Sequence, residues 1–264
     1  MPKLLNVAIE SAKIAGQILI KNFGKITEAQ IETKNKNDFV TYVDKLSEEK
    51  IIGNILKSFP EHAILGEESG ELLTRSEYRW IIDPLDGTTN FIHGVPTFAV
   101  SIALQKNNEL ILGVVYDPLR DELFHAEKGQ GSYLNDKRIY VSKKEELANC
   151  LITTGFPYRT DDYYRDYVKI FAEFMVKTAG IRRPGAAVLD LAYTAAGRFD
   201  GFWEMLLKPW DIAAGAILIE EAGGVITDIN GENTYLLTGS VASGNKLIHE
   251  QIIREIKNAL IKKV

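Results

Sequence analysis

The stretch Arg79-Trp-Ile-Ile-Asp-Pro-Leu-Asp-Gly-Thr-Thr-Asn-Phe-Ile-His-Gly94 carries the clearest signal in this sequence. It opens with an apolar run typical of a buried strand and then places two carboxylates, Asp83 and Asp86, three residues apart across a proline. Such carboxylates are costly to desolvate unless a cation lies between them, and Mg²⁺ prefers oxygen ligands together with substrate phosphate. Gly87 lets backbone N–H groups approach an anion closely, above all where a helix begins. The local chemistry therefore indicates a metal ion and a phosphate group.

Asp-Pro and Asp-Gly are also ordinary turn dipeptides, so two aspartates at this spacing would by themselves fit a plain turn equally well. The full run Asp-Pro-Leu-Asp-Gly-Thr-Thr-Asn-Phe is far more particular. It resembles the signature of the inositol monophosphatase family of Mg²⁺-dependent, lithium-sensitive sugar phosphatases. The resemblance can be tested on the rest of the chain, which should supply the remaining metal ligands.

The composition is that of an ordinary globular protein. The chain has 264 residues, 45% apolar and 25% charged, which fits one large domain or two small ones. Its net charge is −5, and no block of Lys and Arg suggests a nucleic-acid-binding surface. Cys150 is the single cysteine, so we expect no intramolecular disulfide and a small core residue at this position. Because a signal-peptide pattern and a membrane-spanning apolar run are both missing, we expect a cytoplasmic protein.

Hydrophobic periodicity predicts helices and strands that alternate along the chain, without a repeat or a long linker. Strands at 98–104, 110–116 and 122–126 are separated by short turns, which predicts an antiparallel meander. The segment 31–37 reads as an edge strand or a loop. Helices are predicted at 2–23, 41–59, 161–177, 186–197, from 211 to 223 and at 246–261, and further strands at 63–69, 150–155, 199–204, 225–228 and 239–243.

Asp44 lies near the start of the helix predicted at 41–59, where the helix dipole favours a carboxylate for purely structural reasons. The segment Asp38-Phe-Val-Thr-Tyr-Val-Asp44 also resembles the family's Asp-x-Val-Thr-x-x-Asp segment. By this resemblance, Asp44 pairs with Thr88 to activate water.

Two adjacent acids end the strand predicted at 63–69, and such acids are usually solvated. Gly66-Glu67-Glu68 matches the Gly-Glu-Glu segment of the family, whose first glutamate is a metal ligand. The resemblance therefore makes Glu67 a ligand and gives Glu68 an indirect role in holding a third metal ion.

Asp211 occupies the expected N-cap of the next helix, which would contribute about 1 kcal/mol of helix stability by itself. The cap and metal interpretations compete for this carboxylate. Trp210-Asp-Ile-Ala-Ala-Gly215, followed by Glu221-Ala-Gly-Gly224, resembles the second signature of the family, in which the aspartate is a metal ligand. Glu204 matches a glutamate that contacts substrate hydroxyl groups.

The turn Gly185-Ala186-Ala187 enters the helix predicted at 186–197 through small residues, which leaves backbone N–H groups without side-chain cover. Such groups suit an anionic or polyhydroxy ligand, but simple tight packing would explain the composition equally well. By resemblance, the turn borders the ring of the substrate. Arg183, just before it, faces either substrate or a subunit boundary.

The resemblance covers nearly the whole chain. It implies a single domain over residues 1–264 with an α/β fold, layered as an αβαβα sandwich, and two or three Mg²⁺ ions per active site. Asp83 would bridge two ions, with Glu67 and the backbone carbonyl of Leu85 completing the first, Asp86 and Asp211 holding the second, and a weaker third ion lying near Glu67. Because these five positions come from three distant parts of the chain, their joint presence is stronger evidence than any one of them.

The implied reaction is hydrolysis of a phosphate monoester by direct attack of metal-activated water, since no residue resembles a covalent nucleophile beside its own base. Thr88, oriented by Asp44, would position and deprotonate this water. Backbone N–H groups of Gly87 and Thr88 would hold phosphate oxygens. Asp86 and Asp211 would border the substrate as well as the metal.

Glu204 and the turn at 185–187 suit a polyol ring, so myo-inositol 1-phosphate is the first choice of substrate. Fructose 1,6-bisphosphate and adenosine 3′,5′-bisphosphate are alternatives that the shared metal site does not discriminate. Some bacterial relatives bind the transcription machinery, so the chain could instead be an interaction module, although the lack of a basic stripe disfavours direct RNA binding. Family members are commonly homodimers, and we expect the same here.

Overall fold

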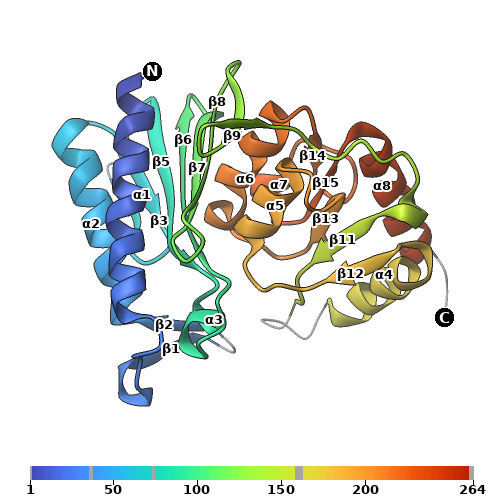
Figure 1. Ribbon diagram of the computed structural model, residues 1–264, viewed down its shortest axis with the longest axis horizontal. Helices are drawn as coiled ribbons and strands as arrows, with labels where there is room; N and C mark the ends of the chain where they lie inside the picture. Colours follow the sequence, from blue (N-terminus) through green and yellow to red (C-terminus); the bar gives the residue numbers. More distant parts are fainter. Residues whose placement is uncertain (1, 36–37, 73–74, 158–162, 262–264) are drawn as a thin grey trace.

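The computed structural model describes residues 2–35, 38–72, 75–157 and 163–261 (Figure 1). Its layers follow the expected αβαβα order: helices cover both outer faces, and two sheets enclose a central layer of helices. Three clusters of buried apolar side chains fill the spaces between neighbouring layers. Within the described ranges, no helix is both long and apolar enough to cross a membrane.

The first outer layer consists of α1 (Pro2–Asn22) and α2 (Tyr42–Ser58), whose observed ends lie within one residue of the predicted ones. The inner face of α1 carries small residues and Leu19, all buried, so the two helices can pack closely on each other and on the large sheet. A short 3₁₀ turn (Glu28–Gln30) and the ribbon of β1 (Ile31–Asn35) and β2 (Asp38–Thr41) connect them. The predicted segment 31–37 is thus a strand as far as 35, and 36–37 lie outside the described residues.

The large sheet has eight strands in the order β10-β9-β8-β7-β6-β5-β3-β4. From β5 to β10 each strand pairs antiparallel with the next, and β6 to β8 are the predicted meander. In contrast, β3 pairs parallel to β5, with Gly66 opposite Ile82. Because carboxyl ends of parallel strands meet at one edge of a sheet, the residues that follow β3 and β5 lie side by side. The strands are β3 (Ala63–Gly66), β4 (Gly70–Leu72), β5 (Tyr78–Asp86), β6 (Ala99–Lys106), β7 (Glu109–Asp117), β8 (Glu122–Glu127), β9 (Gly131–Leu134) and β10 (Lys137–Ile139).

The central layer contains α5 (Ala187–Ala195), α6 (Pro209–Glu221) and α7 (Tyr235–Thr238). Every residue of α6 from Ile212 to Ile219 is buried, because both faces of the helix are covered by other layers. The approach to β7 is so close that a Cβ atom on Gly113 would lie 2.5 Å from Ile217 Cγ2 and 2.7 Å from the Ala214 carbonyl oxygen. Gly113 therefore sets the distance between α6 and the sheet.

Gly113→Ala should destabilise the fold by about 1–3 kcal/mol, because the added methyl group overpacks a closed interface. Gly53, inside α2, is a matched control, since a Cβ atom there meets no atom within 4 Å. Gly53→Ala should stabilise the chain by about 0.5–1 kcal/mol through helix propensity. Urea unfolding of both variants measures the difference, and a Gly113→Ala variant as stable as the parent chain would contradict the close packing.

The small sheet has five strands in the order β12-β11-β13-β15-β14, and α4 (Tyr164–Lys177) and α8 (Lys246–Ile261) form the last layer. α8 matches its prediction at both ends, whereas the predicted start of α4 at 161 lies outside the described residues. Cys150, next to the 3₁₀ turn Leu147–Asn149, is buried, as expected of a core residue. The strands are β11 (Leu151–Thr154), β12 (Gly180–Arg182), β13 (Gly201–Glu204), β14 (Val225–Thr227) and β15 (Val241–Gly244).

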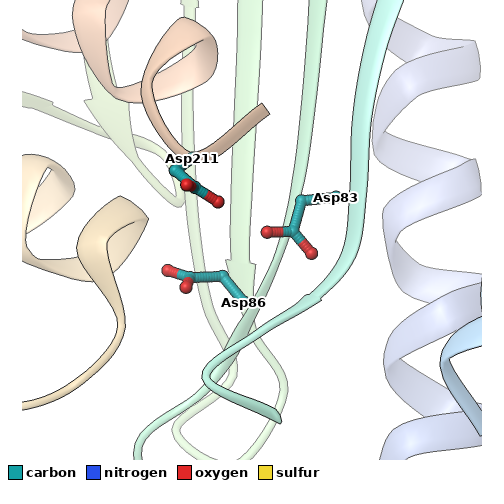
Figure 2. A group of neighbouring side chains, drawn as sticks. All are labelled: Asp83, Asp86 and Asp211. Atoms are coloured by element: carbon teal, nitrogen blue, oxygen red, sulfur yellow. The ribbon is translucent and has the colours of Figure 1, made fainter. Parts of the chain in front are cut away.

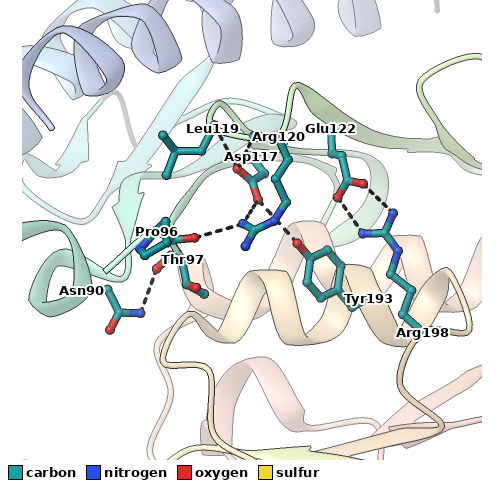
Figure 3. A network of polar contacts seen from close by, with 9 residues as sticks. All are labelled: Asn90, Pro96, Thr97, Asp117, Leu119, Arg120, Glu122, Tyr193 and Arg198. Carbon is teal, nitrogen blue, oxygen red and sulfur yellow. Dashed lines mark hydrogen bonds and ion pairs between the residues drawn. The ribbon is translucent and has the colours of Figure 1, made fainter. Parts of the chain in front are cut away.

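A polar network ties α5 to the turn between β7 and β8 (Figure 3). Arg120 Nη1 donates to Asp117 Oδ2 at 2.7 Å, and the hydroxyl group of Tyr193, on α5, lies 3.5 Å from the same oxygen. Just beyond α5, the guanidinium of Arg198 forms two bonds, of 2.6 and 2.5 Å, with the carboxylate of Glu122. Such forked pairs fix orientation as well as distance, so α5 is held in place over the large sheet.

Candidate metal centre

The last four residues of β5 are Asp83-Pro84-Leu85-Asp86, and the pairing with β6 is irregular between the two aspartates. Pro84 has no backbone N–H to donate to a ladder, which explains the interruption. The backbone N–H of Leu85 instead donates to Asp83 Oδ1 at 2.9 Å. This local bend brings both carboxylates to the carboxyl edge of β3 and β5.

Three carboxylates converge at this edge (Figure 2). Asp83 and Asp86 from β5 and Asp211 from the first turn of α6 point toward a shared space, and each offers an oxygen within 4.8 Å of the others. Asp83 is only 1% exposed. Burial, followed by the charges of Glu67, Asp86 and Asp211, raises its pKa well above the usual range. An all-oxygen group of crowded acids is the donor set that a hard divalent cation neutralises, so these residues fit Mg²⁺.

Glu67 lies outside this group of three but lines the same cavity. A hydrogen bond between the Glu67 and Asp83 side chains also raises the pKa of Asp83, which brings the fourth predicted acid to the cluster. The segment is held by the buried carboxylate of Glu48, which accepts bonds from the backbone N–H groups of Glu68 at 3.0 Å and Ser69 at 2.7 Å. The sequence interpretation missed Glu48; its place on α2, four residues after Asp44, was the available signal.

The expectation that Asp211 is the N-cap of its helix is wrong. Lys208 is the N-cap and Asp211 the third helical residue, because Pro209 starts the helix earlier. Asp211 Oδ2 accepts the backbone N–H of Lys208 at 2.7 Å and so still stabilises the helix start. The Asp211 side chain therefore both accepts a bond at the start of the helix and lies beside Asp83 and Asp86. The two interpretations do not compete for this carboxylate.

Asp44 and Thr88 lie together, as predicted. Thr88 Oγ1 is 3.1 Å from Asp44 Oδ1 and 3.0 Å from the carbonyl oxygen of Leu85. Asp44 Oδ2 accepts both the backbone N–H and the hydroxyl of Thr41, at 2.9 and 2.6 Å, which closes a capping box at the start of α2. Burial raises the pKa of Asp44, although the bonds from Thr41 and Thr88 oppose this shift. Asp44 thus stabilises the start of α2, as its position in the helix predicts, and also contacts Thr88.

Gly87 is the N-cap of α3 (Thr88–Ile92) in a left-handed conformation with φ 94°. A Cβ atom there would lie 2.8 Å from the Thr97 carbonyl oxygen, so a larger residue would be both strained and obstructed. The start of α3 lines the cavity, where backbone N–H groups of Gly87 and Thr88 could meet phosphate oxygens.

Two adjoining chambers open beside the acids. The first, of about 320 Å³, contains the four acids, Gly87 and Thr88. The second, of about 70 Å³, adds Ala186, Ala187, Asp190 and Glu204. Asp86, Phe156, Arg183, Gly185 and Asp211 line both chambers. The predicted substrate residues therefore border one continuous site, and Arg183, stacked 5.1 Å from the Phe156 ring, lies on its wall.

The expectation of uncovered N–H groups at the start of α5 is wrong at Val188, whose backbone N–H donates to Asp86 Oδ2 at 2.8 Å. The acceptor of this N–H group lies about a hundred positions away in the sequence. Inspection of the local sequence cannot reveal such a contact. This bond attaches the first turn of α5 to the acidic cluster.

Two further polar residues position the site and were missed. Asn90 Nδ2 lies 2.8 Å from the Thr97 carbonyl oxygen and 2.9 Å from that of Pro184, which joins α3 to the turn before α5 (Figure 3 draws the first bond). Asp190, buried on α5, accepts the hydroxyl of Thr153 at 2.9 Å. Burial and then the charge of Glu204 raise the pKa of Asp190 well above its usual range. A lone acid in an otherwise apolar helix was the only available signal.

Comparisons with known proteins agree with this arrangement. The model of the inositol monophosphatase family matches residues 1–260. Nus factor SuhB of Escherichia coli K12 is 45% identical over 261 residues, covering 98% of each chain. The crystal structure of extragenic suppressor protein suhB from Bartonella henselae superposes with a TM-score of 0.94 at 42% identity, covering 97% of this chain and 98% of that one. Inositol monophosphatase from Anabaena gives a TM-score of 0.85 at 40% identity, covering 97% and 96%. This chain belongs to the inositol monophosphatase family.

Proposed function

We propose that this chain, as a single catalytic domain over residues 1–264, hydrolyses phosphate monoesters, with myo-inositol 1-phosphate as its preferred substrate. The observation that carries the proposal is the convergence of acids from three distant stretches on one cavity. Membership of a phosphatase family that is in general Mg²⁺-dependent supports it. The polar second chamber, with Glu204 and Asp190, suits a polyol ring rather than an apolar alcohol.

Glu67, Asp83, Asp86, Asp211 and the backbone carbonyl of Leu85 would hold two Mg²⁺ ions, with a third near Glu67. When bound, these ions lower the pKa of water and offset the charge that develops on phosphate and the leaving group. The positive charge of these ions would offset the repulsion between the buried Asp83 carboxylate and the acids around it.

The chain's own contribution to proton transfer would come from Thr88 and Asp44. Thr88 Oγ1 would accept the proton of the attacking water while its own proton passes to Asp44 Oδ1, 3.1 Å away. Burial raises the pKa of Asp44, which favours holding this proton. The backbone N–H groups of Gly87 and Thr88 would bind phosphate oxygens, and Glu204 would accept hydrogen bonds from substrate hydroxyl groups.

Phosphate release from myo-inositol 1-phosphate, with Mg²⁺ titrated and with or without lithium, tests the proposal. Fructose 1,6-bisphosphate and adenosine 3′,5′-bisphosphate run in parallel. We expect Mg²⁺-dependent release, inhibition by lithium, and the largest kcat/KM for the inositol ester. Release from another ester alone would correct the substrate, and release from none would reject the phosphatase proposal.

A second function is favoured by the name Nus factor SuhB that similar bacterial proteins carry. We propose that this chain also binds a component of the transcription machinery. Affinity capture from cell extract, followed by identification of RNA polymerase subunits and their associated factors, tests this. An Asp83→Asn bait should capture the same proteins if binding is independent of catalysis, and capture of no transcription protein would reject the proposal.

We further propose a homodimer that buries the outer face of α4. Val168, Met175 and Val176 lie exposed on this helix, with Val176 80% exposed. Val176→Glu should therefore shift the chain toward the monomer, because the charge would have to be desolvated in an interface. Light scattering after size exclusion measures the mass. Leu237→Glu, on α7 and 89% exposed in the parent chain, is the control that should leave the mass unchanged; a monomeric parent chain would contradict the proposal.

A further inference from the structure

Leu206 has a backbone conformation that its side chain disfavours. Its φ of 67° lies in the left-handed region, where the Cβ atom of an ordinary residue approaches its own backbone too closely. Asparagine and aspartate tolerate this region, and the other non-glycine residues with positive φ in the described ranges are of these types: Asn107, Asn108, Asp121 and Asn135. Leu206 is thus the exception among the described residues.

The surroundings force this conformation. Met205 packs into the core between the small sheet and the outer helices, whereas Leu207 packs into the core of the central layer. The backbone N–H of Leu207 donates to the Gly239 carbonyl oxygen at 2.8 Å, and a Cβ atom on Gly239 would lie 2.2 Å from the Leu207 carbonyl oxygen. With both neighbours anchored on opposite sides of the small sheet, Leu206 must make the reversal.

Glycine would make the same reversal without strain, so the reversal itself does not require a side chain at this position. The leucine side chain is half-buried against the core between the small sheet and the outer helices. Leu206 also lines the second chamber, together with Glu204 and Asp190. That chamber measures only about 70 Å³. A branched apolar residue therefore borders the chamber beside the two carboxylates, where a smaller residue would leave more space.

We propose that Leu206 is a specificity-determining residue that limits the size of the alcohol the site accepts. The two chambers share a wall at Asp86 and Asp211, so a phosphate bound in the first places its alcohol in the second. Leu206 narrows this space to a single polyol ring and excludes alcohols that carry a nucleoside or a second phosphate group. This inference rests on the proposed phosphatase function.

Leu206→Gly and Leu206→Ala test the inference by turnover. The ratio of kcat/KM for adenosine 3′,5′-bisphosphate to that for myo-inositol 1-phosphate should rise by about tenfold or more in both variants, because removing several carbons from a pocket wall relaxes discrimination by this order. Ile253→Ala is the matched control: Ile253 is half-buried against the same core but lies outside both chambers, and its variant should keep the parent ratio.

The thermal stability of the two variants tests the backbone strain at position 206 separately from the size of the chamber. Alanine normally gives a more stable chain than glycine, whereas at position 206 the glycine variant should unfold at the higher temperature, because only glycine relieves the left-handed backbone. The reverse order would overturn the strain argument. An unchanged substrate ratio in both variants would overturn the assignment of Leu206 as a specificity determinant.

Failure of the phosphatase proposal has a different signature. If the parent chain cleaves neither ester, ligand-induced shifts of the melting temperature, measured with both esters and Ca²⁺, report the size limit without turnover. A relative gain for the adenosine ester in the two Leu206 variants would then support the inference. Equal shifts in parent and variants, or no shift with either ester, would overturn it.

Discussion

Asp83→Asn should lose turnover by roughly a thousandfold or more while keeping its fold. In the proposed site this carboxylate would help to hold the cations, whose contribution to transition-state stabilisation would be several kcal/mol, and each 1.36 kcal/mol corresponds to about tenfold in rate. The fold should survive because an asparagine Oδ1 can still accept the backbone N–H of Leu85, a bond of 2.9 Å in the parent chain. Loss of one charge from four crowded acids should leave the metal-free protein at least as stable.

The measurement is kcat at saturating Mg²⁺, with thermal unfolding followed by circular dichroism. Asp228→Asn is the matched control, because Asp228 is equally buried but lies away from the site. It accepts the backbone N–H groups of Asn230 and Glu232 and the hydroxyl of Thr234, at 2.8, 2.9 and 2.8 Å. Its amide variant should lose stability and keep kcat, the opposite pattern. Near-normal turnover by Asp83→Asn would reject its assignment as a metal ligand.

Thr88→Ala should lower kcat by roughly a hundredfold to ten-thousandfold, the usual contribution of a positioned proton-transfer group. KM should change little, because in the proposed mechanism the hydroxyl would act on the attacking water, whereas backbone groups would hold the phosphate. Thr88→Ser keeps an oxygen at the same distance from Asp44 Oδ1 and Leu85 O, and should retain turnover within about tenfold.

Steady-state kinetics of the alanine and serine variants distinguishes this role from a structural one, since only a chemical role is rescued by serine. Thr178→Ala, at the end of α4, removes a hydroxyl that donates to the Phe174 carbonyl oxygen at 2.7 Å. It should cost some stability and leave kcat unchanged. If Thr88→Ala turned over as fast as Thr88→Ser, the proton path through Thr88 and Asp44 would be wrong.

Motifs in which chemistry and local structure coincide were predictable from the sequence. An apolar run followed by Asp-Pro predicts β5 and the position of Asp83 in it, because the strand and the interruption of its pairing at a proline are local properties. The meander from β6 to β8 was predictable for the same reason. The assignment of each acid to a metal or to water is a prediction that neither the fold nor the family match tests.

Other features depend on contacts that sequence inspection does not contain. Glu48 and Asn90 position the site through backbone groups that lie 20 and 94 residues away in the chain. α6 begins before the predicted N-cap at Asp211, because Pro209 favours the first helical position more strongly than Asp211 favours the cap. α7, of four residues, is too short to show a helical period, and Met205-Leu206-Leu207 gives no local sign of a left-handed residue.

The enclosure of α6 between two sheets has a consequence for how long the protein survives. Residues 212–219 of α6 are all buried, so this part of the helix cannot open locally and its amide hydrogens should exchange only when the whole chain unfolds. Asp211 is in its first turn, and a cation bound there would slow that exchange, since a ligand held only by the folded chain raises its stability with concentration. Magnesium supply would thereby set resistance to proteolysis as well as the rate of reaction.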